Sequence, residues 1–141
     1  MPTQDPFLEF IGSSVLEADS HHAVAEQRPA AELDNHAGVR HAGALFNVGY
    51  AASRALVAAA VAPNSPSAET RMVDSEIVYE KVVGDERVIA TAEPAAGDWE
   101  SLLGRLGSGE AVLLPTSVTL RSDDGRTFTT MSISWNVTPS R

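Results

Sequence analysis

The sequence His41-Ala42-Gly43-Ala44-Leu45-Phe46 opens a run of alanine-rich apolar residues that continues to Val61. Residues 42–61 read AGALFNVGYAASRALVAAAV, and alanine and leucine are both strong helix formers. Two prolines follow at positions 63 and 66, so we predict one long helix from His41 or Ala42 to about Val61. Apolar residues lie on nearly every side of it, which is typical of a helix wrapped by other structure. The run therefore favours a sheet curled around one central helix.

Strand-like patterns occur on both sides of this helix. Before it, Val15–Leu33 is consistent with strand pieces that Pro29 interrupts, and the adjacent His21 and His22 would point to opposite sides of a strand. After it, the turns Gly84-Asp85-Glu86 and Asp124-Gly125 each predict a hairpin. The four strands of these hairpins would span Thr70–Val83, Arg87–Ala92, Ala111–Arg121 and Thr127–Val137.

Two short helical segments complete the pattern. Asp5-Pro6 precedes apolar residues at helical spacing, which predicts a short lid-like helix that ends near Gly12. Trp99–Leu106 predicts one or two helical turns inside an irregular stretch. The order of elements predicts an α+β domain in which an antiparallel sheet wraps one long central helix.

Composition narrows the classes of protein and partner. With 141 residues, the chain has the length of a single domain, which we place at residues 1–141. The formal net charge of -9 argues against nucleic acid or an anionic membrane as the main partner, and Arg54 inside the long helix argues against a membrane span. No cysteine is present, which excludes a thiolate nucleophile. Met1–Phe10 carries acids and no basic region, so it does not resemble a secretory signal, and we expect a cytoplasmic protein.

The segment from Asn35 to Gly43 joins turn residues and histidines to the start of the long helix. The first N–H groups of a helix lack intrahelical partners, and the peptide dipole adds partial positive charge there. This suits a carbonyl oxygen that gains negative charge. On local chemistry alone, Asn35 also fits a plain turn residue and His41 a plain helix cap. No third metal ligand stands at a recognisable spacing, so we predict no metal site.

These residues resemble the hot-dog-fold thioesterase superfamily, specifically its phenylacetate-pathway-like branch and related uncharacterised domains. The similarity spans Val15 to Val137. Its most specific part is Asn35 followed by His41-Ala42-Gly43, which is similar to the Asn and the His-Gly-Gly or His-Ala-Gly of the family. The segment Ile77–Lys81 and the Asp-Gly hairpin that ends at Trp135 support it.

The resemblance implies an acyl thioesterase that needs no cofactor. Two subunits would join their sheets edge to edge as a homodimer, with active sites at the interface, or as a tetramer of two such dimers. The thioester carbonyl would lie at the helix start, held by the backbone N–H of Ala42 or Gly43. Asn35 would position the thioester or the attacking water, and His41 would lie at the carbonyl pocket.

The chain departs from the family at the carboxylate that activates water. Nine residues after the motif histidine, where relatives carry Asp or Glu, this sequence has Tyr50. A phenol with a pKa of about 10 is a poor general base at neutral pH. Tyr50 would instead orient water together with Asn47, or pack in the core or a dimer interface.

The remaining candidates concern substrate binding. Arg40, Arg71 and Lys81 would contact the phosphates of coenzyme A, although charged strand residues that face water fit the same pattern. Glu69 would supply a displaced carboxylate, or is a solvated loop acid. We also predict Phe46 in the substrate site. Ser53 lacks a nucleophile elbow, and we interpret it as helix packing.

Three functions follow from this pattern. The leading one is hydrolysis of an acyl-coenzyme A or another acyl thioester. The alternative is a non-catalytic hot-dog protein that binds an acyl thioester or an apolar ligand. A dehydratase ranks last, because the helix lacks the acid that it would pair with a histidine.

Overall fold

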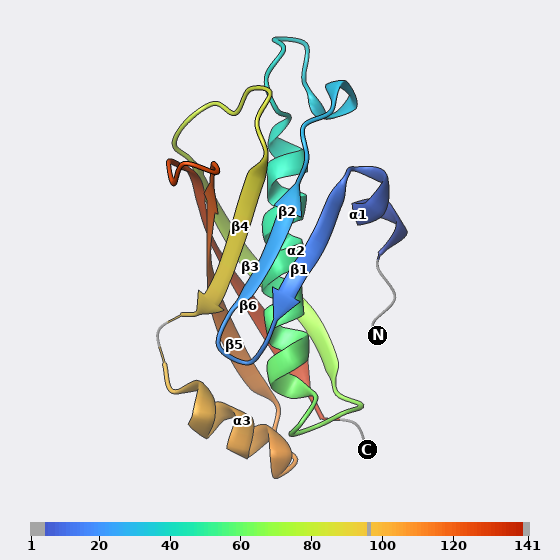
Figure 1. Cartoon of the computed structure of the whole chain (residues 1–141). Helices are drawn as coiled ribbons and strands as arrows, with labels where there is room; N and C mark the ends of the chain where they lie inside the picture. The colour runs from blue at the N-terminus through green and yellow to red at the C-terminus, as the bar shows by residue number, and fades with distance from the viewer. Residues whose placement is uncertain (1–4, 96, 140–141) are drawn as a thin grey trace.

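One antiparallel sheet of six strands curls around a single long helix (Figure 1). The computed structural model describes residues 5–95 and 97–139. The predicted single domain over residues 1–141 and the segment Met1–Phe10 both include residues outside these ranges. The strand order is β1-β2-β4-β5-β6-β3. In chain order the elements are α1 (Pro6–Phe10), β1 (Ser13–Ala18), β2 (Ala23–Gln27), the 3-10 helix η1 (Ala31–Leu33), α2 (Ala42–Val61), β3 (Glu69–Tyr79), β4 (Val88–Pro94), α3 (Trp99–Gly107), β5 (Val112–Arg121) and β6 (Thr127–Thr138).

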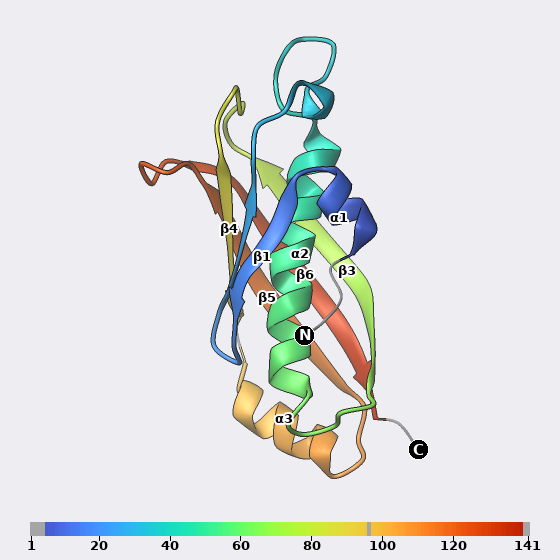
Figure 2. The same ribbon diagram turned by 45° about the vertical axis from the view of Figure 1, so that its right-hand side comes forward.

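Helix α2 confirms the predicted central helix and its boundaries. It lies across the concave face of the sheet and contacts β1, β2, β4, β5 and β6 (Figure 2). By length and composition alone α2 could cross a membrane, but more than half of it is buried against the sheet. At Gly49 an added Cβ would collide with Met131 Sδ, so the side chain of Met131 in β6 packs directly against the backbone of the helix.

The hairpin at Asp124-Gly125 is confirmed, and β5 pairs with β6 along nearly its whole length. Buried and exposed residues alternate along β5, because one face packs on α2. Helix α3 confirms the predicted turns at Trp99–Leu106. The predicted short helix is α1, which Asp5 caps by accepting a hydrogen bond from the N–H of Phe7.

The predicted hairpin at Gly84-Asp85-Glu86 is wrong. Strand β3 pairs with β6 at the edge of the sheet, whereas β4 lies between β2 and β5. The alternate residues Val88, Ala90 and Ala92 of β4 are fully buried, which suits an inner strand. Most residues of β3 are exposed, which suits an edge. The burial of β4 and the exposure of β3 therefore outweigh the local turn signal at Gly84-Asp85-Glu86.

The strand pieces within Val15–Leu33 also need a correction. Strand β2 ends at Gln27, and the residues after Pro29 form η1 instead of a strand. His21 and His22 lie in the turn between β1 and β2, where their backbone N–H groups both donate to Asp19 Oδ1. They do not lie on a strand, because the Asp19 side chain stabilises the turn.

Candidate functional site

His41 caps helix α2 with its own imidazole. Its Nδ1 accepts a hydrogen bond from the N–H of Gly43 at 3.0 Å, and its carbonyl accepts from Ala44 and Leu45. A neutral imidazole whose Nδ1 accepts carries its proton on Nε2, an assignment that follows from the hydrogen bond. His41 therefore presents a donor to the exposed surface at the start of α2.

The N–H of Ala42 remains free at this helix start. It makes no hydrogen bond within residues 5–95 and 97–139, whereas the N–H of Gly43 is occupied by His41. Of the two N–H groups that the family resemblance suggested for the carbonyl, the geometry leaves Ala42 available. Ala42 is exposed, so a ligand can reach this group.

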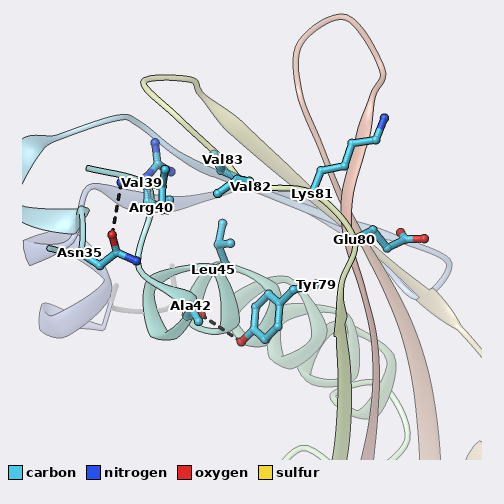
Figure 3. A pocket seen from close by; sticks show the side chains of 10 residues that line it. All are labelled: Asn35, Val39, Arg40, Ala42, Leu45, Tyr79, Glu80, Lys81, Val82 and Val83. Carbon is cyan, nitrogen blue, oxygen red and sulfur yellow. Dashed lines mark hydrogen bonds between the residues drawn. The ribbon is translucent and has the colours of Figure 1, made fainter. Parts of the chain in front are cut away.

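Asn35 organises the loop that leads into the helix. Its Oδ1 accepts hydrogen bonds from the N–H groups of Ala37 and Val39, at 2.9 and 3.3 Å. Its backbone N–H donates to the carbonyl of Val39 at 2.8 Å, which closes the loop. In Figure 3 the amide nitrogen of Asn35 points toward the start of α2. The side-chain oxygen thus holds the turn, while the nitrogen faces the space beside Ala42.

A pocket of about 390 Å³ opens at the start of α2, between the loop and the chain that follows β3. Four of the predicted site residues line it, namely Asn35, Arg40, Ala42 and Lys81; the others are Val39, Leu45, Tyr79, Glu80, Val82 and Val83. The side chains of Glu80 and Lys81 point away from α2 in Figure 3. The remaining lining combines the polar residues Asn35, Arg40 and Tyr79 with apolar side chains.

Tyr79 ties the end of β3 to the first turn of α2. Its hydroxyl donates to the carbonyl of Ala42 at 3.2 Å, and 46% of the residue is exposed. Burial of the ring raises the pKa of Tyr79, so its hydroxyl stays protonated as a donor at neutral pH. Sequence reasoning noted Tyr79 only as part of a strand. No sequence signal places Tyr79 beside the helix start, because this contact joins residues far apart in the chain.

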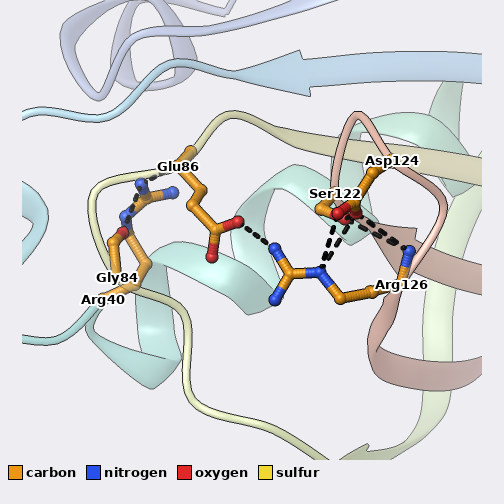
Figure 4. A network of polar contacts seen from close by, with 6 residues as sticks. All are labelled: Arg40, Gly84, Glu86, Ser122, Asp124 and Arg126. Atoms are coloured by element: carbon orange, nitrogen blue, oxygen red, sulfur yellow. Dashed lines mark hydrogen bonds and ion pairs between the residues drawn. The ribbon is translucent and has the colours of Figure 1, made fainter.

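Arg40 is a buried structural link. Only 3% of it is exposed, and its guanidinium donates to Gln27 Oε1 at 2.9 Å and to the carbonyls of Gly84 and Glu86 (Figure 4). Burial lowers the pKa of Arg40, although nearby acids oppose this. The expectation of a charge that faces water does not hold for Arg40, because β2 and the loop before β4 cover it.

The Arg40 network reaches the tip of the β5–β6 hairpin. The carboxylate of Glu86 pairs with Arg126, which also contacts Asp124 (Figure 4). On the other side, Gln27 Nε2 donates to the carbonyl of Ala44 in the first turn of α2 at 2.8 Å. The helix start is thus held by hydrogen bonds from several strands and loops.

Tyr50 lies in an aromatic cluster on α2, away from the pocket. Its ring centroid is 6.4 Å from that of Phe46 and 5.5 Å from that of Trp135. Trp135 Nε1 donates to Ser53 Oγ at 2.8 Å, and Ser53 lies 2.6 Å from Thr116 Oγ1. Ser53 is fully buried and packs as the sequence predicts.

Tyr50 and His41 do not meet within one subunit. Nine residues along a helix correspond to roughly 13 Å at about 1.5 Å per residue. Asn47 lies between them, and its Nδ2 donates to the carbonyl of Gly43 at 2.7 Å. This hydrogen bond uses one of the groups through which Asn47 would hold a water.

Glu69 and Arg71 lie on the other face of the sheet. They pair with Thr138 and Asn136 of β6, whereas the neighbouring Val137 and Trp135 are buried against α2. Residues directly opposite on paired strands share a face, so Glu69 and Arg71 point away from α2. They line a second, polar pocket of about 440 Å³ with Thr70, Asn136 and Thr138.

The site at the start of α2 is suited to a neutral carbonyl ligand. It offers the free N–H of Ala42, the positive end of the helix dipole and the imidazole of His41. Within residues 5–95 and 97–139, no group of three His, Asp or Glu side chains is arranged to share a metal ion. The arrangement can polarise a carbonyl oxygen, and a base for water must come from elsewhere.

Comparison with known proteins identifies the fold and the family. The antiparallel sheet of this chain around one helix is the hot-dog fold, and solved structures named as hypothetical thioesterases share it. The chain belongs to the family described as a domain of unknown function, DUF4442, which matches residues 1–137. No curated protein matches the chain.

Three solved structures illustrate the likeness. AziG from S. sahachiroi has 18% identity and a TM-score of 0.81, over 98% of this chain and 100% of that chain. A mutant of the phenylacetic acid degradation protein PaaI from Thermus thermophilus has 19% identity and a TM-score of 0.73, over 94% and 98%. A hypothetical thioesterase with coenzyme A from Streptococcus pneumoniae has 17% identity and a TM-score of 0.71, over 92% and 88%. At these identities the likeness shows the fold.

Proposed function

We propose that this protein binds an acyl thioester at the start of α2 and hydrolyses it. The observation that carries the proposal is the free N–H of Ala42, which lies at the positive end of a long helix beside an open pocket. The hot-dog relatives named as thioesterases, one of them solved with coenzyme A, support this class of substrate.

The helix start would stabilise the charge that forms during hydrolysis. A water oxygen bonds to the thioester carbon, and the carbonyl oxygen gains negative charge and accepts from the N–H of Ala42. The carbon–sulfur bond then breaks, and the thiolate takes the proton that the water released. The Nε2–H of His41 would donate to the oxyanion or to the leaving sulfur, while the amide nitrogen of Asn35 would orient the ligand.

The remaining substrate contacts are part of the same proposal. Lys81, which lines the pocket, would meet the phosphates of coenzyme A at the protein surface, and Arg71 would meet them only if the ligand reaches the outer face of the sheet. Phe46 lies in the aromatic cluster beyond the pocket, so it would line only the far end of the acyl site. Tyr50 would orient water from a partner subunit in a cytoplasmic homodimer, or in a tetramer of two dimers. Arg40, Glu69 and Arg71 are weaker candidates. Buried acceptors occupy Arg40, whereas Glu69 and Arg71 both face away from α2.

The decisive variant is Ala42→Pro, which removes the N–H and little else. Proline is favoured at the first position of a helix, and His41 already has the extended backbone that a following proline requires. Release of free thiol from short, medium, long and aromatic acyl-coenzyme A thioesters should fall about 100-fold, as when an oxyanion donor is removed. The carbonyl of Ala42 remains available to Tyr79.

A matched control is Ala37→Pro, since the N–H of Ala37 already donates within the loop to Asn35. Loss of this hydrogen bond should loosen the loop and lower the melting temperature, whereas Ala42→Pro should leave it nearly unchanged. Native protein that releases no thiol from any thioester would refute hydrolysis.

A second function is favoured by Tyr50. Among the described residues that line the pocket, the one carboxylate, Glu80, points away from α2. The family resemblance would place the usual acid at Tyr50. In this alternative the protein binds an acyl thioester without cleaving it. Thermal stabilisation by an acyl-coenzyme A without turnover, and hydrolysis gained with Tyr50→Glu, would support it.

A further inference from the structure

Arg40 places a buried positive charge in the wall of the pocket at the start of α2. Only 3% of the residue is exposed, and it lines the pocket beside Val39 and Val83 (Figure 3). Arginine keeps its proton in proteins, so this guanidinium is a full charge that folding has removed from water. Buried charges are normally paired with an opposite charge. The groups in contact with Arg40 therefore decide whether its charge is compensated.

Two of the three guanidinium nitrogens have acceptors, and all of these acceptors are neutral. Nη1 donates to the amide oxygen of Gln27, and Nη2 donates to the carbonyls of Gly84 and Glu86 (Figure 4). The third nitrogen, Nε, is buried and has no acceptor among the described residues. A buried donor without a partner costs free energy, so such atoms are rare and call for a bound group. The Nε–H of Arg40 is thus a donor in the pocket wall that the chain leaves unpaired.

The nearby acids do not neutralise Arg40 by contact. Asp34, Asp85 and Glu86 favour its charged form from a distance, yet no carboxylate within residues 5–95 and 97–139 forms an ion pair with it. The carboxylate of Glu86 is engaged in an ion pair at the tip of the β5–β6 hairpin. Glu80, the one acid that lines the pocket, points away from α2 in Figure 3. A ligand in the pocket can therefore supply the anion that Arg40 lacks.

We propose that the substrate is an acyl thioester whose acyl group ends in a carboxylate, and that Arg40 binds this carboxylate. The inference rests on the proposed function, in which the thioester carbonyl lies at the N–H of Ala42. Arg40 and Ala42 are two residues apart, so their Cα atoms lie within about 7 Å of each other. Binding sites so close together suit a short dicarboxylic acyl group.

The state of Arg40 favours a carboxylate over a phosphate of coenzyme A. Arginine commonly binds phosphate through a fork of two N–H groups, whereas here only Nε is without an acceptor. The hydrogen bonds to Gln27 and Glu86 already hold the guanidinium in place, so a ligand binds it at little cost in side-chain entropy. A neutral acyl group would displace water from the pocket without compensating the charge. The pocket should therefore discriminate between charged and neutral acyl groups.

Calorimetric binding of matched ligands tests this substrate class in the native protein. The ligands are malonyl, succinyl and glutaryl ketone analogues of coenzyme A, in which a methylene replaces the thioester sulfur and prevents hydrolysis. In the neutral partner of each, an isopropyl group takes the place of the carboxylate. At least one carboxylate analogue should bind about tenfold more tightly than its neutral partner, as expected of a hydrogen bond to a charged group. Equal or tighter binding of the neutral partner in all three pairs would overturn the proposal.

The NMR resonance of the Arg40 Nε–H identifies the group that meets the carboxylate. In the native protein it should shift with the tightest carboxylate analogue, but not with the neutral partner or with coenzyme A alone. An equal shift with coenzyme A alone would place a phosphate at Arg40. No shift with any ligand would leave Arg40 out of the binding site. Either result would overturn the proposal.

Substitution of the two cations of the pocket provides a further test. Arg40→Lys should lose most of the preference for the carboxylate, because an ammonium group cannot keep the contacts of Arg40 and also bind the ligand. Lys81→Met is the matched control, since the side chain of Lys81 points away from α2 (Figure 3), and it should keep the preference. The opposite pattern would assign the selectivity to Lys81 and refute the proposal. If Arg40→Lys does not fold, the resonance of the native protein decides.

These measurements are independent of turnover. Native protein that prefers the carboxylate analogues but releases no thiol from any thioester would refute hydrolysis and retain the carboxylate site. Turnover of neutral acyl thioesters without any preference for the carboxylate analogues would refute the carboxylate site and retain hydrolysis.

Discussion

The hydroxyl of Tyr79 donates a hydrogen bond to the carbonyl of Ala42 at 3.2 Å, which joins the edge strand β3 to the first turn of α2. The two residues are far apart in the sequence, and they line the same pocket. Because the carbonyl belongs to the peptide that follows the free N–H of Ala42, this contact also fixes the helix start where we propose that a ligand binds.

Tyr79→Phe should loosen the first turn of α2 with little loss of stability. A hydrogen bond at a partly exposed site contributes about 0.5–1.5 kcal/mol to the free energy of unfolding. Hydrogen exchange should become faster for the amides of the first turn. Tyr50→Phe is the control, since no hydrogen bond of its hydroxyl occurs in the described part of the chain. Equal exchange in both variants would show that the contact does not order the helix start.

Arg40→Met should destabilise the protein strongly. It leaves the acceptors on Gln27, Gly84 and Glu86 without their buried donor, which should lower the free energy of unfolding by about 2–4 kcal/mol in urea titrations. Arg121→Met, on the exposed surface of β5, should change it by less than about 0.5 kcal/mol. Loss of thioester binding without loss of stability would instead assign Arg40 to the substrate.

Two glycine substitutions should have opposite effects. Gly49→Ala places a methyl group against Met131 and Leu120, so overpacking should lower the free energy of unfolding by about 1–3 kcal/mol. Gly104→Ala lies in α3 with nothing within 4 Å of the new Cβ, so this substitution should raise the free energy of unfolding by about 0.5–1 kcal/mol. Thermal and urea unfolding would measure both. Stabilisation by Gly49→Ala would contradict the close approach of α2 to β6.

The hairpin tip should titrate at unusually low pH. Hydrogen bonds from Ser122 and then Arg126 lower the pKa of Asp124 from 3.8 to about 2. A lowered folded pKa means that this contribution to stability is present above pH 3.8 and is lost as the pH falls through about 2. Carboxyl NMR titration should show that Ser122→Ala and Arg126→Gln each raise the pKa of Asp124. Asp19, which backbone N–H groups of His21 and His22 hold below its usual pKa, should not respond.

Local sequence determined the elements that depend on neighbouring residues. The alanine-rich run and the prolines after it specify α2, because helix propensity and termination act within a few residues. Asp124-Gly125 specifies the β5–β6 hairpin in the same way. The turn of Asn35 and the cap of His41 are also local, which is why both were predictable as alternatives to functional roles.

Only the tertiary structure decided which distant strands meet. The turn at Gly84-Asp85-Glu86 predicts a hairpin, yet β3 pairs with β6 at the edge of the sheet, while β4 lies inside the sheet and buries Val88, Ala90 and Ala92. The bulge between Met72 and Asp74 then decides the face on which Arg71 lies. Tertiary packing also buried Arg40 and brought Tyr79 to Ala42. Such contacts depend on the closure of long loops, which no local pattern encodes.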